Sequence, residues 1–254
     1  MTEPILLTTA RVCTFNGSYL RTNASGFFFE RGQRLFFVTS RHVMQDAASG
    51  HQPDRIEIEV HTNASDLGQS TQFSIPLYRN GKRLWRQGVD SAGEIDVAAI
   101  ELDRNAFPAT AVYYAFGPAH LQADLHDAGV GSSLLVIGFP LGFHDTLHHM
   151  PVVRQAVMAS SFGLRFKGQG YFLTDARTHR GISGAPVVMR ARQPTPEQGD
   201  LPWVLLGVHS ARLDVGARDQ ADESLGLNCA WYADILMTLT DDPADQQFRA
   251  SSAA

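Results

Sequence analysis

Short segments of β-type sequence recur along the whole of this 254-residue chain. In each segment, aliphatic, aromatic and β-branched residues run together or alternate, and clusters of glycine, proline, asparagine and aspartate separate one segment from the next. Helical periodicity is rare, so the pattern favours an antiparallel sandwich or barrel over alternating strands and helices. The segments are Gly26–Glu30, Leu35–Val38, Arg55–Val60, Val97–Leu102, Leu134–Ile137, Val152–Ala159, Tyr171–Thr174, Ala185–Met189 and Val204–Val208. We therefore expect an all-β protein.

A serine stands between two glycines at residues 181–186, Gly-Ile-Ser-Gly-Ala-Pro. A serine hydroxyl is a weak nucleophile unless a base removes its proton and hydrogen-bond donors stabilise the oxyanion that forms on the substrate. Glycine permits backbone conformations in which nearby N–H groups face the same open space. The N–H groups of Gly181 and Ser183 are therefore candidates for an oxyanion hole. Taken alone, this motif is more often a tight polar turn.

Two segments upstream supply a base and an acid that suit this serine. The apolar run Arg34–Thr39 is followed closely by His42, and a histidine suits general-base catalysis because its unperturbed pKa is about 6.5. Asp96 opens a second apolar run, and a buried carboxylate needs a partner such as the Nδ1–H of a histidine. His42 as a helix cap and Asp96 as a turn residue are the alternatives. The order histidine, aspartate, serine favours a catalytic set of His42, Asp96 and Ser183.

These segments resemble those of the trypsin-like (chymotrypsin-fold) serine peptidases, in the style of bacterial single-domain and HtrA-type members. Residues 39–43, Thr-Ser-Arg-His-Val, resemble that family's Thr-Ala-x-His motif, and residues 95–100, Ile-Asp-Val-Ala-Ala-Ile, resemble its aspartate motif. Residues 181–186 resemble its Gly-Asn-Ser-Gly-Gly-Pro, although Ile182 and Ala185 depart from that pattern. Further matching segments extend the resemblance over nearly the whole chain.

The resemblance implies two six-stranded antiparallel β-barrels with a C-terminal helix. Residues 1–115 would form an N-terminal barrel that carries the histidine and the aspartate, and residues 116–240 a second barrel that carries the serine and the specificity pocket. An amphipathic pattern predicts the helix over Trp231–Thr240, packed on the second barrel. Residues 241–254 would form a flexible tail.

The resemblance also implies a serine endopeptidase that works through an acyl-enzyme without a cofactor. A catalytically silent module of the same fold, binding a peptide or protein partner, is the main alternative, and an esterase is the other. The intact set of three residues favours an enzyme over the silent module. Peptide and ester substrates share acyl-enzyme chemistry, so the sequence barely separates a peptidase from an esterase.

A specificity pocket is expected beside the serine. In the family, residues just before the nucleophile and on a later strand line the pocket, which here implies Thr178, His209 and Ser210 as substrate-binding residues. A threonine and a histidine at these positions resemble bacterial glutamyl endopeptidases and viral 3C-type proteases, which bind a Glu or Gln side chain at P1. A hydroxyl and an imidazole N–H can both donate to a carboxylate or amide oxygen. A core histidine and an ordinary strand threonine are the alternative.

A histidine-rich segment at residues 143–149, Phe-His-Asp-Thr-Leu-His-His, suggests a metal site. On a helix, His144 and His148 would share one face, as zinc ligands can. The segment instead follows Phe139-Pro-Leu-Gly and precedes Pro151, which favours a loop, and it lacks the glutamate of a zinc-peptidase helix. We therefore expect His144, His148 and His149 to lie in a solvated or substrate-facing loop, and no metal.

The net charge and the cysteine content limit which binding partners and which cellular compartment are expected for this protein. A net charge of −5 argues against nucleic-acid binding through bulk electrostatics. No stretch has the ~20 apolar residues of a membrane span, and the N-terminus lacks a secretory signal. The two cysteines, Cys13 and Cys229, lie in apolar stretches, where buried inert thiols are expected rather than a bridge or a nucleophile. We expect a cytoplasmic protein with peptide or protein substrates, no nucleic acid and no membrane partner; the oligomeric state is open.

Overall fold

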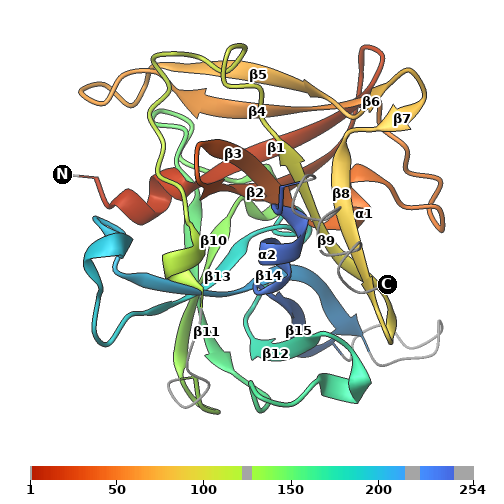
Figure 1. Cartoon of the computed structure of the whole chain (residues 1–254), viewed down its shortest axis with the longest axis vertical. Coiled ribbons are helices and arrows are strands. Elements are labelled where there is room, and N and C mark those ends of the chain that lie inside the picture. The colour runs from red at the N-terminus through yellow and green to blue at the C-terminus, as the bar shows by residue number, and fades with distance from the viewer. Residues whose placement is uncertain (1, 122–127, 215–223, 243–254) are drawn as a thin grey trace.

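The structure is a computed structural model, and it describes residues 2–121, 128–214 and 224–242. Two β-sheets make up most of it, one above the other in Figure 1, with β1–β5, β8 and β9 in the upper sheet and β10–β15 in the lower one. The all-β class and the chymotrypsin-like fold are confirmed. No helix in the described part of the chain is long and apolar enough to cross a membrane.

The N-terminal sheet has seven antiparallel strands in the order β5-β4-β1-β2-β3-β9-β8. A short hairpin, β6–β7, stands apart from it, and the 3-10 turn η1 precedes it. The bounds are η1 Pro4–Thr8, β1 Thr9–Asn16, β2 Tyr19–Arg31, β3 Arg34–Thr39, β4 Arg55–His61, β5 Ser70–Pro76, β6 Tyr78–Arg79, β7 Lys82–Arg83, β8 Trp85–Asp90 and β9 Gly93–Glu101.

This sheet differs from the six-stranded closed barrel that was expected. It has seven strands and is not closed by hydrogen bonds among the residues described. It nevertheless encloses one core, because Ile75 on edge strand β5 and Trp85 on edge strand β8 belong to the same buried cluster as Val12, Phe37 and Ile58. Side-chain packing, rather than a hydrogen-bonded seam, brings the two ends of the sheet around this core.

The C-terminal sheet is a closed six-stranded barrel in the order β10-β11-β12-β15-β14-β13, which confirms the expectation for this half. Its interior packs apolar residues of the barrel strands, and Ile182 beside the candidate nucleophile is buried there. The 3-10 turns η2, η4, η5 and η6 lie at Pro118–His120, Pro140–Gly142, Phe166–Gly168 and Pro196–Gln198. The strands are β10 Ser133–Gly138, β11 Val152–Met158, β12 Tyr171–Asp175, β13 Pro186–Arg190, β14 Trp203–Asp214 and β15 Ser224–Tyr232.

The expected C-terminal helix is shorter and lies elsewhere. Trp231 and Tyr232 end strand β15, and the helix α2 covers only Ile235–Leu239. It contacts β8 and β9 of the first sheet rather than packing on the second barrel alone. Leu236 and Leu239 are buried in a cluster that joins the two sheets, so the interface between the sheets determines where the helix lies.

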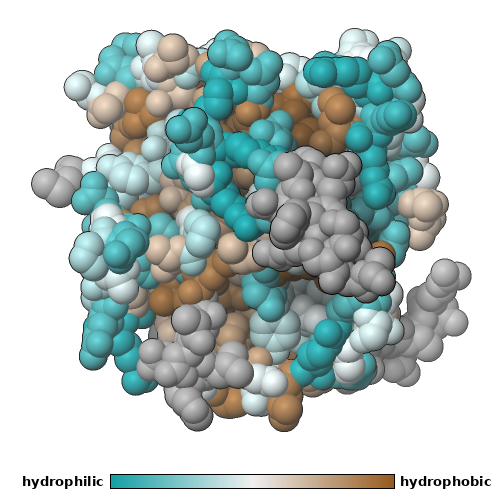
Figure 2. Space-filling model, in the orientation of Figure 1, coloured by the Kyte–Doolittle hydropathy of each residue, from teal (hydrophilic) through white to brown (hydrophobic). Residues whose placement is uncertain are grey.

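A third buried cluster fills the space between the two sheets. It includes Phe27, Val97 and Phe116 with Val188 and Leu205 of the barrel. Figure 2 shows hydrophobic residues at the surface over β10 and β13, and further hydrophobic patches near the top of the view. Residues 243–254 of the predicted tail lie outside the described residues.

Candidate active site

Strand pairing brings His42 and Asp96 together. Strands β3 and β9 are antiparallel, with Thr39 opposite Ala98, so the residues just after Thr39 lie beside Asp96. His42 belongs to the one-turn helix α1, Arg41–Met44, that follows β3. Its Nδ1 lies 2.7 Å from Asp96 Oδ2, and its backbone N–H donates to Asp96 Oδ1 at 2.9 Å. The carboxylate therefore holds both the ring and the main chain of the histidine.

Asp96 is a mostly buried carboxylate with several donors. Burial alone would raise its pKa, but the hydrogen bonds and charge of His42, together with the Ser210 hydroxyl, outweigh burial and lower the pKa below its ordinary value. Asp96 is therefore ionised at neutral pH and favours the tautomer of His42 that carries its proton on Nδ1. The Ser210 side chain, predicted to bind substrate, donates to this carboxylate instead.

The turn that carries Ser183 requires glycine on both sides. Gly181 and Gly184 have φ values of +91° and +85°, which L-residues with a Cβ rarely adopt. A Cβ on Gly181 would lie 2.6 Å from the Phe139 carbonyl oxygen, and one on Gly184 would lie 2.2 Å from the Ser25 carbonyl oxygen. The turn therefore sits tightly against both neighbouring segments.

Ser25, on β2, joins this turn to the rest of the site. Its N–H donates to the Ser183 carbonyl at 2.9 Å, and its hydroxyl donates to the Gly181 carbonyl at 2.8 Å. The same hydroxyl accepts from Phe139 N–H at 2.9 Å. These bonds connect the first sheet to the nucleophile turn and to the segment after β10. The sequence analysis did not identify this role of Ser25.

The Ser183 hydroxyl is not bonded to His42. It donates to the Ser210 carbonyl oxygen at 3.0 Å. Among the described residues, no acceptor is found for the N–H groups of Gly181 and Ser183, the pair predicted as an oxyanion hole. Both residues line one cleft with His42, so the serine, the histidine and these donors share an opening to solvent.

That cleft has a volume of about 630 Å³. Its walls come from residues 20–24 at the start of β2, from the segment after α1, and from the loop after β10 that contains Leu141. Arg21, Arg180 and His51 also line it, and sequence reasoning did not identify them. Nothing in their local sequence indicates a cleft, because segments far apart in the chain form it.

Comparison with known proteins decides the family. The model of the trypsin-like peptidase domain matches residues 24–193, more than half of the chain and a range that contains His42, Asp96 and Ser183. The chain belongs to the trypsin-like peptidase family. A comparison with curated protein sequences finds no match.

Solved structures share the fold of this chain. Two structures of the HtrA-type protease AlgW with a tripeptide align with 15% identity and TM-scores of 0.55 and 0.54, covering 92% of this chain and 59% of theirs. The serine endoprotease from Yersinia pestis aligns with 15% identity and a TM-score of 0.53, covering 92% of this chain and 62% of its own. The peptidase chain thus spans less than two thirds of the length of these proteins.

The residues predicted for the specificity pocket are all buried, and none of them lines the cleft described above. Thr178 is buried, and its hydroxyl donates to Asn228 Oδ1 at 2.5 Å. Asn228 in turn donates to the Ala176 carbonyl at 2.7 Å. The Thr178 proton is therefore engaged within the protein, and its oxygen is left as an acceptor. Asn228 was missed because the sequence around it does not indicate strand β15.

His209, on β14, is almost completely buried in the peptidase. Its Nδ1 has no hydrogen-bond partner among the described residues. Burial, with a smaller contribution from the charge of His42, lowers its pKa to about 3. The imidazole is therefore neutral at physiological pH.

This burial makes the stability of the protein depend on pH. Between about pH 6.5 and about pH 3, the unfolded chain binds a proton at His209 that the native protein does not bind, so acid favours unfolding. We expect the free energy of unfolding to fall by about 1.4 kcal/mol per pH unit from this group as pH is lowered through that window. Urea unfolding at pH 6.5 and pH 4.5 would measure the fall, and His209→Phe should reduce it. Equal losses in the wild type and the variant would contradict the assignment.

The two cysteines are unsuited to nucleophilic chemistry. Both are buried and free, as expected. Burial raises the pKa of the Cys13 thiol, and it raises that of Cys229 to about 11. Thiolate is the reactive form of cysteine, so these residues are inert at neutral pH and leave Ser183 as the candidate nucleophile.

Proposed function

We propose that this protein is a serine endopeptidase in which Ser183 attacks the peptide carbonyl, His42 is the general base and Asp96 orients His42. The observation that carries the proposal is the hydrogen bond of 2.7 Å between Asp96 and His42, because His42 lines the same cleft as Ser183. Membership of the trypsin-like peptidase family supports serine protease activity and peptide or protein substrates.

The proposed first step requires Ser183 to change its hydrogen bond. Its hydroxyl now donates to the Ser210 carbonyl, and a rotation about the Cα–Cβ bond would turn it toward Nε2 of His42. The base then takes the serine proton while the oxygen attacks the carbonyl carbon, and Asp96 stabilises the imidazolium that forms. His42 afterwards protonates the leaving amine, and water hydrolyses the acyl-enzyme by the same route.

The developing oxyanion needs preorganised donors. We propose that the N–H groups of Gly181 and Ser183 supply them, since both line the cleft and neither has an acceptor among the described residues. Removal of one such donor costs about 10²–10³ in turnover in a comparable serine protease. A fluorophosphonate probe tests the assembled site directly: it labels an enzyme with an activated serine and does not label a silent binding module.

An esterase on the same fold is the remaining alternative, because it would use the same acyl-enzyme. A peptide library incubated with protein that reacts with the fluorophosphonate probe separates the two activities. Cleavage of internal peptide bonds supports the endopeptidase. Hydrolysis of activated esters without any peptide cleavage would overturn it.

We further propose a preference for Glu or Gln at P1, with His209 as the donor once substrate binding exposes its buried imidazole. Because the Thr178 proton is engaged by Asn228, the threonine contributes an oxygen acceptor, which suits the amide N–H of Gln. Cleavage after Glu or Gln should exceed cleavage after Leu or Phe, since an apolar side chain leaves buried polar groups unpaired. His209→Ala should erase the difference, a loss of about 1–3 kcal/mol in transition-state binding.

Peptide libraries analysed by mass spectrometry would measure this preference. Val208→Ala, one residue away on the same strand and buried in the core, controls for a general loss of packing around His209. A library cleaved mainly after Arg, Lys or large apolar residues would contradict the pocket and leave the catalytic residues untouched.

A further inference from the structure

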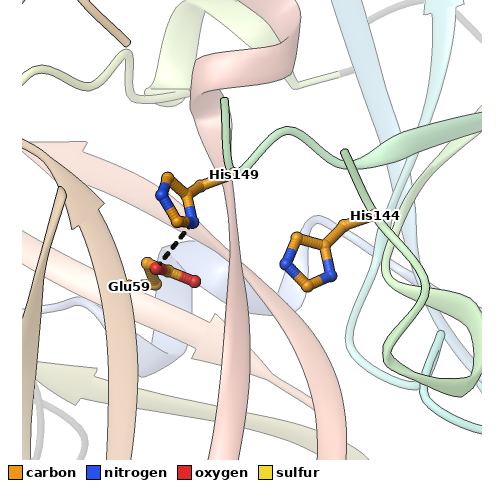
Figure 3. Close-up of side chains that lie close together, drawn as sticks. All are labelled: Glu59, His144 and His149. Atoms are coloured by element: carbon orange, nitrogen blue, oxygen red, sulfur yellow. Dashed lines mark ion pairs between the residues drawn. The ribbon is translucent and has the colours of Figure 1, made fainter. Parts of the chain in front are cut away.

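Three metal-ligand side chains converge on the side of β4 that faces the loop after β10. Glu59 lies on β4, and His144 and His149 lie in the loop that precedes β11 (Figure 3). One candidate ligand atom from each lies within 4.8 Å of the other two. His149 Nδ1 is 2.8 Å from Glu59 Oε1. The histidine-rich segment is a loop, as expected, but tertiary contacts assemble a different set of residues from the helical pair considered in the sequence.

The tautomer of His144 leaves a lone pair available for an ion. Its Nδ1 lies 2.6 Å from the Gly142 carbonyl oxygen, which can only accept, so Nδ1 carries the proton. The other ring nitrogen is turned toward Glu59 and His149 in Figure 3. Metal-binding histidines commonly donate their second N–H to a carbonyl or carboxylate in this way, which fixes the ring and raises its basicity.

Glu59 is oriented by two further contacts. The Ser70 hydroxyl donates to Oε1 at 3.0 Å, and Arg11 Nη2 contacts Oε2 at 3.2 Å. Oε1 is therefore the oxygen that faces His149, and Arg11 holds the other one. The side chain of Glu59 is only 10% exposed and that of His149 is 23% exposed, so the cluster is shielded but open enough for a water ligand.

We propose that Glu59, His144 and His149 bind one divalent transition-metal ion, with Zn²⁺ as the best match. Two imidazole nitrogens and one carboxylate oxygen are ligands that zinc accepts, with water in the fourth position. Ligands held at about 2.0–2.2 Å in a tetrahedron lie about 3.4 Å apart. The candidate atoms lie within 4.8 Å of one another, so the widest separation must shrink by roughly 1.4 Å or less, within the reach of small rotations. His149 Nδ1 and Glu59 Oε1, now 2.8 Å apart, must instead separate slightly, because the ion replaces the hydrogen bond between them and the proton of that bond is released to solvent.

The ion would tie the first sheet to the loop that borders the cleft. That loop begins with Leu141, which lines the cleft and whose N–H donates to the Arg180 carbonyl at 2.5 Å. At its other end, His61 Nε2 already contacts the His148 carbonyl oxygen at 2.7 Å. The Glu59–His149 pair also joins β4 to the loop. Bound zinc would bring His144 into this connection, so it should stabilise the folded protein by mass action. This proposal does not depend on peptidase activity.

Isothermal titration of chelator-treated full-length protein with ZnCl₂ tests the site, using the Ser183→Ala protein to exclude self-cleavage. We expect one Zn²⁺ per chain and a rise in melting temperature with zinc. His144→Ala and His149→Ala should each weaken binding at least about 10-fold, the minimum seen when even an outer partner of a metal ligand is lost. Both variants should also lose the zinc-dependent rise.

His148→Ala is the matched control. His148 is adjacent to His149 but is exposed, and its ring contacts Asp145 rather than the cluster. This variant should bind zinc like the parent protein. If the His149→Ala protein does not fold, the His144→Ala protein still tests the site, because that substitution leaves the Glu59–His149 pair intact. Absence of stoichiometric binding, or equal affinity in the parent, His144→Ala and His148→Ala proteins, would overturn the proposal.

Discussion

Ser183→Ala should abolish both fluorophosphonate labelling and peptide cleavage. Removing the nucleophile of a serine protease lowers turnover by about six orders of magnitude, because the other catalytic residues act only together with it. The folded structure should remain, since the lost hydroxyl makes one hydrogen bond, to the Ser210 carbonyl, worth about 1 kcal/mol. Probe labelling, a peptide assay and a melting curve measure the three quantities.

Ser133→Ala is the matched control for this experiment. Ser133 is exposed on β10 and does not line the cleft, so its replacement should leave labelling, cleavage and melting unchanged. Equal labelling of wild type and Ser183→Ala would refute Ser183 as the nucleophile. A variant that lost labelling together with its cooperative melting transition would indicate a structural role for Ser183 instead.

Asp96→Asn should lower turnover by about four orders of magnitude, the loss seen when the corresponding acid of a serine protease is replaced by its amide. An amide in place of Oδ2 can donate to His42 Nδ1 and would favour the wrong tautomer of the imidazole. The loss should appear in kcat, measured with a peptide substrate under saturating conditions, because the acid does not touch the substrate.

Asp90→Asn is the control for Asp96. Asp90, at the end of β8, is paired with Arg165 and makes no contact with His42. Its replacement should alter turnover little. A fall of only a few-fold in Asp96→Asn, or a similar loss in both variants, would mean that another group orients the base.

Many of the strands could be predicted from the sequence, because a buried strand requires a run of apolar residues at consecutive or alternate positions. Each of the apolar runs found in the sequence lies in or overlaps an observed strand, from Gly26–Glu30 in β2 to Val204–Val208 in β14. Strands β1, β5, β6, β7, β8 and β15 were missed because each is very short or has polar residues or glycine interspersed among its apolar ones. Pairing with a neighbouring strand, rather than local propensity, makes these segments β-strands.

The candidate catalytic residues were identifiable for a similar reason. A histidine after a strand, an aspartate at the start of one and a serine between two glycines each have a local sequence signature. The glycines flanking Ser183 are required by close contacts with Phe139 and Ser25, and that requirement is visible in the sequence as the motif itself.

Contacts between distant segments were decided by the tertiary structure alone. The Ser183–Ser210 bond, the Thr178–Asn228 bond and the Glu59–His149 pair join residues that are far apart in the chain. Helix α2 likewise lies against β8 and β9 because the two sheets meet there. The sequence by itself determined the β-rich fold class and the residue types of the site. The distances among the side chains of the site depend on how the two sheets pack against each other, and this packing cannot be predicted from local sequence.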